Sequence, residues 1–145
     1  MDPETLKLET RAAFRRVAKP KREDIAPHVC LECDELESAL DPYTSENLPD
    51  YVFAKHCWDL PLLSDEAKQY YLPAWILRSI ETPQSDSTQA LLYALESDHR
   101  WHPATPYTER QWRLLTAYLE FLGQRVDEFV IEDIAKAKHR LNREP

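Results

Sequence analysis

Two cysteines separated by two residues are the part of this sequence best suited to chemistry. Cys30 and Cys33 form a C-x-x-C motif, a spacing that allows two thiolates to bind one metal ion. A tetrahedral zinc site needs two further ligands, and a histidine lies on either side of the pair, at His28 and His56. The sequence therefore predicts a candidate zinc site with His28, Cys30, Cys33 and His56 as its ligands.

The same side chains have other interpretations. Cys33 and Cys57 suit a helical core as small apolar residues, with His28 hydrogen-bonded or exposed and no cofactor present. Thiol redox chemistry is a third interpretation, although the sequence predicts no strand before the motif, as a thioredoxin-like site requires. If zinc is bound, four protein ligands favour a structural ion, whereas a zinc enzyme needs an open position and a nearby glutamate as base.

Acidic residues are concentrated in the middle third of the chain. The 145 residues carry a net charge of -8, and between Ala26 and Trp75 ten acidic side chains face two basic ones. This excess either keeps the surface solvated or forms a docking surface that attracts a basic protein partner. In the second interpretation, Glu35, Glu37 and Asp50 belong to the partner-binding surface.

A loop between two predicted helices contains a second candidate contact. The segment from Asp98 to Pro103 includes Arg100 and Trp101, residue types that often anchor protein interfaces. Trp101 either anchors a partner or folds back onto the helices as a lid.

Several function classes do not fit the sequence. The chain has one glycine and lacks the phosphate-binding, nucleophile-elbow and H-E-x-x-H motifs. Its acidic charge disfavours binding to nucleic acid, although an acidic segment that mimics DNA remains compatible with it. No apolar run is long enough to span a bilayer and the first residues do not resemble a signal peptide, so we expect a cytoplasmic protein that does not enter membranes.

A non-catalytic protein-binding module agrees best with this profile. Bacterial immunity proteins and antitoxins are small, acidic and rigid, because they cover a basic surface on a toxin. We therefore expect a module that sequesters a basic protein, with a zinc enzyme or a zinc-stabilised domain as the alternative.

The elements that must position these residues are helices. The chain has a single glycine, and tight β-hairpin turns usually need glycine. No segment alternates apolar and polar residues as a strand does, whereas apolar residues recur at helical spacing. We predict one all-α domain over residues 1–145, an irregular bundle of seven helices. The first predicted helix starts after Asp2 and ends before Lys19. The next three span Glu32–Leu40, Pro49–Trp58 and Ser64–Ile80. The fifth begins at Thr82–Pro83, the sixth begins at Thr108, and the last spans 127–142.

The helix from Ser64 to Ile80 should lie at the centre of this bundle. Apolar side chains cover almost its whole circumference, as in a buried helix. Pro73 lies inside it, so we expect a kink between Gln69 and Pro73.

Two segments together resemble a known family. The stretch from His28 to Leu36, read as H-x-C-x-E-C, precedes the stretch from Leu60 to Ala74, read as L-P-L-L-S-x-E-A-x-x-Y-Y-L-P-A. This pairing is similar to a bacterial family of small soluble proteins classed as a domain of unknown function. The resemblance covers 25–125 and leaves the 127–142 helix outside; it implies a fold group and no activity.

Overall fold

The computed structural model describes residues 1–96, 107–126 and 128–142, and within these it contains seven α-helices, two short 3₁₀ helices and no strand. The elements are α1 (Pro3–Phe14), η1 (Arg22–Asp24), α2 (Leu31–Leu40), α3 (Asp50–His56), η2 (Cys57–Leu62), α4 (Asp65–Glu81), α5 (Asp86–Glu96), α6 (Glu109–Gly123) and α7 (Glu128–Asn142). Side-chain caps mark the starts of α1, α2, α4 and α6. The predicted all-α bundle is confirmed.

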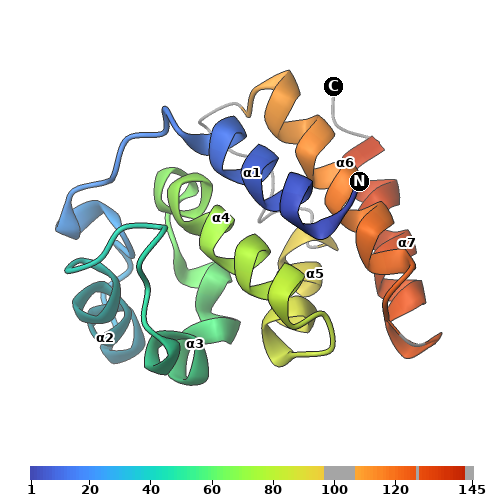
Figure 1. Ribbon diagram of the computed structural model, residues 1–145. Coiled ribbons are helices and arrows are strands. Elements are labelled where there is room, and N and C mark those ends of the chain that lie inside the picture. Colours follow the sequence, from blue (N-terminus) through green and yellow to red (C-terminus); the bar gives the residue numbers. More distant parts are fainter. Residues whose placement is uncertain (97–106, 127, 143–145) are drawn as a thin grey trace.

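Helix α4 is the centre of the bundle, as its apolar circumference predicts. Figure 1 shows α4 between α2 and α3 on one side and α6 and α7 on the other, with α1 lying along it. Tyr71, Leu72, Trp75 and Ile76 of α4 are fully buried. The helix continues without a break through Pro73, and the predicted kink there stays a prediction.

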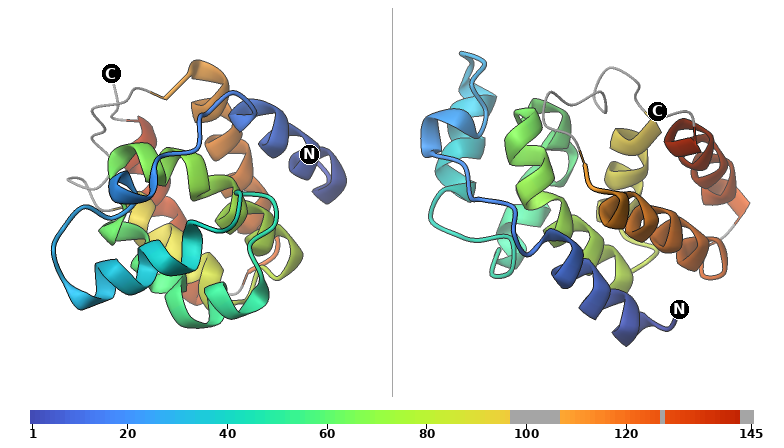
Figure 2. Two further views of the ribbon diagram at one scale, coloured as in Figure 1. Left: turned by 90° about the vertical axis from the view of Figure 1, so that its left-hand side faces the viewer. Right: turned by 90° about the horizontal axis from the view of Figure 1, so that it is seen from above.

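The remaining helices pack around α4 in two groups. Helices α1 and α5 contact α4 directly, and α6 and α7 contact each other and pack on α1 and α5, respectively. Helix α2 contacts α3 at the other end of the molecule, an arrangement that is clear when the bundle is seen from above (Figure 2). The C-x-x-C motif at the start of α2 therefore lies on a peripheral part of the bundle.

Two of the predicted helix starts are confirmed in detail. The Ser64 side chain accepts a hydrogen bond from the backbone N–H of Ala67 at 3.0 Å and so caps α4. Thr108 and Gln111 form the reciprocal pair of hydrogen bonds that defines a capping box at the start of α6. These contacts satisfy amides that a helix cannot pair internally.

Helix α1 ends at Phe14, before Lys19, as predicted. Two other predicted boundaries were wrong. The helix predicted for Pro49–Trp58 ends at His56 and passes into a 3₁₀ segment that contains Pro61, where a proline removes an N–H donor. Helix α5 starts at Asp86, because Thr82 instead follows the end of α4 and donates its backbone N–H to Arg78.

Gly123 offers a direct test of how this bundle ends its helices. A Cβ added at Gly123 would meet no atom within 4 Å, and its backbone φ is not positive. Gly123→Ala should therefore stabilise the protein by about 0.4–1 kcal/mol, because alanine has less conformational freedom to lose on folding. Urea unfolding of both proteins measures the difference, and a destabilised variant would contradict this account of α6.

Candidate metal centre

Helix α2 begins with an unusual cap. Cys30 has an extended backbone conformation, and its Sγ accepts a hydrogen bond from the backbone N–H of Cys33 at 3.3 Å. Serine, threonine, aspartate and asparagine are the usual residues at this position, because an oxygen accepts from the free amides of the first turn. Here a sulfur atom takes that place, and the helix start therefore fixes the first cysteine relative to the second.

The segment before α2 is held in place from the centre of the bundle. Ser64, at the start of α4, donates its backbone N–H to the carbonyl of Ile25 at 2.9 Å and its hydroxyl to the carbonyl of Asp24 at 2.6 Å. Ile25 and Ala26 are fully buried beside this contact. The chain that leads to His28 thus starts from a fixed point.

Three of the four predicted ligands come together at the start of α2. The side-chain ligand atoms of His28, Cys30 and Cys33 all lie within 4.8 Å of one another. The two sulfurs are in direct contact, with Cys30 Sγ and Cys33 Sγ 2.8 Å apart. His28 is exposed, Cys30 is half-buried and Cys33 is fully buried, and both cysteines are free thiols. This group can hold a metal ion at the surface.

The two thiols differ in acidity. Hydrogen bonding with Cys33, and then with His28, lowers the pKa of Cys30 below its ordinary value. Burial, reinforced by the hydrogen bond with Cys30, raises the pKa of Cys33 to about 11. As the pH rises, Cys30 therefore loses its proton first and becomes the more reactive sulfur of the pair.

This difference predicts the order of alkylation by iodoacetamide in metal-free protein. The thiolate is the reactive form, and a lowered pKa keeps Cys30 as a thiolate at pH values where Cys33 and Cys57 are protonated. Cys57 should react late because its burial raises its pKa. Peptide mapping by mass spectrometry should find Cys30 modified first at neutral pH, whereas denatured protein should react at all three cysteines. Earlier modification of Cys33 or Cys57 in folded protein would contradict this order.

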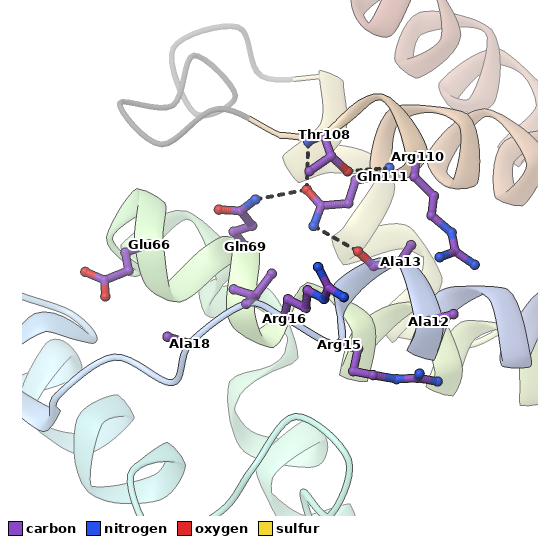
Figure 3. A pocket seen from close by; sticks show the side chains of 11 residues that line it. Ala12, Ala13, Arg15, Arg16, Ala18, Glu66, Gln69, Thr108, Arg110 and Gln111 are labelled. Atoms are coloured by element: carbon purple, nitrogen blue, oxygen red, sulfur yellow. Dashed lines mark hydrogen bonds between the residues drawn. The ribbon is translucent and has the colours of Figure 1, made fainter.

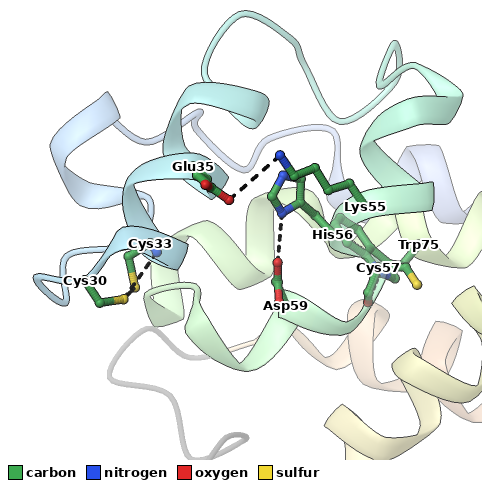
Figure 4. A network of polar contacts seen from close by, with 8 residues as sticks. All are labelled: Cys30, Cys33, Glu35, Lys55, His56, Cys57, Asp59 and Trp75. Atoms are coloured by element: carbon green, nitrogen blue, oxygen red, sulfur yellow. Dashed lines mark hydrogen bonds and ion pairs between the residues drawn. The ribbon is translucent and has the colours of Figure 1, made fainter.

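The fourth predicted ligand, His56, lies outside this group. Its side chain is buried at the end of α3, where Nδ1 and Asp59 Oδ2 are 2.8 Å apart. Figure 4 shows the His56 ring and Asp59 on the α3–η2 side, away from the sulfurs of Cys30 and Cys33. The proposed set of four ligands is not assembled, because the fold turns His56 toward the carboxylate three residues ahead.

The acidic residues predicted to bind a partner are paired within the chain. Glu35 Oε2 lies 3.8 Å from Lys55 Nζ, and Glu37 Oε1 lies 4.0 Å from Arg22 Nε. Asp50 forms an ion pair with Arg78. Exposed pairs of this kind contribute about 0–1 kcal/mol to stability, but each reduces the uncompensated negative charge on the surface. Arg100 and Trp101, the other two predicted contact residues, lie outside the described residues.

Sequence reasoning missed the apolar residues that flank Cys30. Val29 is 93% exposed and Leu31 is 73% exposed. Leu31 begins α2, but the buried positions of that helix are Cys33, Leu36 and Leu40. The helical spacing already indicated that Leu31 is exposed, because position 31 does not lie on the buried face of the helix that Cys33, Leu36 and Leu40 form.

A pocket of about 820 Å³ lies elsewhere, between the end of α1, helix α4 and the start of α6. Figure 3 shows the amides of Gln69 and Gln111 on its wall, joined by a 2.9 Å hydrogen bond, with Arg15 and Arg16 nearby. Its lining contains no cysteine or histidine. The thiol and imidazole chemistry of the described residues is thus separate from this pocket.

The chain matches no protein-family model, no curated protein and no solved structure in the comparisons made. Its resemblance to a bacterial domain family therefore stays a prediction. Among the helices described, none combines the length and apolar character needed to cross a membrane.

Proposed function

We propose that this protein binds one zinc ion through His28, Cys30 and Cys33. The observation that carries the proposal is the convergence of their three ligand atoms to within 4.8 Å of one another. Two of these ligands come from the first turn of α2 and its cap, and the third comes from the segment that precedes the helix. A bound ion would therefore join the loop to the helix.

The donor set selects among metals. Two thiolates and an imidazole are soft or intermediate ligands, which suit zinc, whereas calcium and magnesium prefer oxygen. Zinc binds cysteine sulfur at about 2.3 Å, so two sulfurs at tetrahedral angles lie about 3.8 Å apart. The 2.8 Å contact between Cys30 and Cys33 must open on binding. Cys30 is half-buried at the helix cap, so zinc binding would have to turn its sulfur away from Cys33.

Three protein ligands leave one tetrahedral position open. In zinc sites this position is filled by water or by a donor from another molecule. His28 is exposed, and so are Val29 and Leu31 beside the cysteines. A ligand from solution would therefore have access to an ion held by these residues, and such an ion would serve recognition as well as local stability.

Zinc titration of reduced, chelator-treated protein tests the proposal. We expect one equivalent to bind and the melting temperature to rise, because metal binding to the folded state adds to its stability. The matched control is Cys57→Ser, since Cys57 lies outside the cluster of three. Fully folded protein that takes up no zinc, or a loss of binding in the control, would overturn the proposal.

A second proposal is that the exposed side of α2 docks a basic protein. Glu32 and Asp34 are exposed in its first turn, and neither forms an ion pair with another described residue. They lie on the same helix as exposed Leu31, so charge and apolar surface occur together. This combination supports the immunity-like or antitoxin-like function expected from the acidic composition.

Binding kinetics at low and high salt would test this docking surface with an isolated partner. The double change Glu32→Lys and Asp34→Lys should slow association at low salt, because it replaces attraction to a basic partner with repulsion. The difference should shrink at high salt, because salt screens exposed charges. Reversal of Glu35, Glu37 or Asp50 should have a smaller effect, since each already has a cationic partner. Association that ignores both salt and the double change would show that the charge only solvates the surface.

A further inference from the structure

The two sulfurs at the start of α2 are close enough to bond to each other. Cys30 and Cys33 are free thiols whose Sγ atoms are 2.8 Å apart. A disulfide bond is about 2.05 Å long, so the sulfurs need to move together by less than about 1 Å. Because both residues belong to the cap and first turn of α2, this movement requires no rearrangement of the fold.

The site is also asymmetric toward a reagent in solution. Cys30 is half-buried, whereas Cys33 is fully buried behind it. The Cys30 sulfur accepts the N–H of Cys33 at the positive end of a ten-residue helix, an arrangement that favours a charged sulfur at this point. A disulfide from solution therefore meets Cys30 first, and the Cys33 sulfur is accessible only to the Cys30 sulfur.

The two sequence neighbours of Cys30 are exposed apolar residues. Val29 and Leu31 are 93% and 73% exposed and are the direct neighbours of Cys30. Contiguous exposed apolar surface often marks a site of interaction with another molecule. These two side chains offer apolar contact surface beside Cys30 to a disulfide-containing substrate.

We infer that Cys30 and Cys33 form a dithiol that reduces disulfides by thiol–disulfide exchange. The Cys30 sulfur attacks one sulfur of the substrate disulfide, a mixed disulfide forms at Cys30, and the first substrate thiol leaves. The Cys33 sulfur then attacks Cys30, the Cys30–Cys33 bond forms, and the second substrate thiol leaves. The protein loses two electrons and two protons, and the substrate disulfide gains them as two thiols.

Zinc binding and this reaction exclude each other. A Cys30–Cys33 disulfide removes two of the three metal ligands, so oxidation should release the ion with its charge unchanged. This part rests on the proposed zinc site, whereas the exchange reaction itself does not. The site therefore has two states, one reduced with metal bound and one oxidised without metal.

Oxidised glutathione added to metal-free protein is the first test. We expect the number of free thiols to fall from three to one, with mass mapping that places the new bond between Cys30 and Cys33. Cys33→Ser should stop at a glutathione adduct on Cys30, because the second attack is lost. Cys57→Ser should behave as wild type apart from its missing thiol. Since Cys33 is buried, circular dichroism must first show that Cys33→Ser is folded.

Zinc-loaded protein is the second test. Each disulfide formed should release one zinc ion, measured with a colorimetric chelator. A wild-type protein that retains all three thiols, or that collects stable glutathione adducts, would overturn the exchange reaction. Retention of zinc after the disulfide has formed would overturn the coupling. Failure of the zinc site alone appears differently, as normal oxidation in the metal-free arm with no zinc bound at the start.

Discussion

Zinc affinity should fall by at least about 100-fold when Cys33 is replaced with serine, because even the loss of groups behind metal ligands costs about 10–100-fold. Cys33 supplies one of only two sulfurs in the group of three ligands. A serine hydroxyl is a poor substitute for a thiolate on zinc. Competition between the protein and a chromophoric chelator measures the change.

Stability and binding must be separated in this variant, because Cys33 is fully buried. A buried hydroxyl without a partner costs about 1–3 kcal/mol, so Cys33→Ser should lower the melting temperature even without metal. His28→Ala is the companion variant, since His28 is exposed. It should leave the metal-free melting temperature nearly unchanged and still weaken zinc binding. Equal zinc affinity in wild type, Cys33→Ser and His28→Ala would contradict the assignment of ligands.

Replacement of Trp75 with alanine should destabilise the protein by about 3–5 kcal/mol, the usual cost of emptying a buried aromatic site. Trp75 is fully buried on α4, and its Nε1–H donates to the carbonyl of Cys57 at 3.0 Å. Its ring also packs edge-on against Phe53, with ring centroids 5.2 Å apart. The loss would affect the contact between the central helix and the α3–η2 segment.

Trp58 provides the matched control for this change, because it is 51% exposed in the same region of the chain. Trp58→Ala should cost less than about 1 kcal/mol, as expected for a surface position. Urea unfolding of both variants measures the free energies. Similar losses at the two positions would show that α4 is not the centre of the core.

Local signals explain which parts of the fold could be predicted. Ser64 and the pair Thr108 and Gln111 cap their helices through residues three positions apart, so the sequence contains both partners of each contact. The buried circumference of α4 was likewise visible in its apolar residues. The bundle and its central helix follow from such patterns.

Contacts between distant residues explain the rest. The pairing of Asp50 with Arg78 joins positions 28 residues apart, and no local pattern indicates it. His56 was assigned to the metal from its position downstream of the C-x-x-C pair, whereas the direction of its side chain depends on how α3 passes into η2. The role of Cys30 as a helix cap was missed because sulfur is rarely expected there. The C-x-x-C spacing and nearby His28 were nevertheless enough to predict that these three side chains come together.

X-ray absorption spectroscopy of the zinc-loaded, reduced protein tests the ligand set most directly. Zinc bound by His28, Cys30 and Cys33 should show two sulfur neighbours at about 2.3 Å, one imidazole nitrogen at about 2.0 Å and a further light atom from solvent. His28→Ala should remove the imidazole signal and keep both sulfurs. A spectrum with only nitrogen and oxygen neighbours, or one that does not change in His28→Ala, would contradict the site at the start of α2.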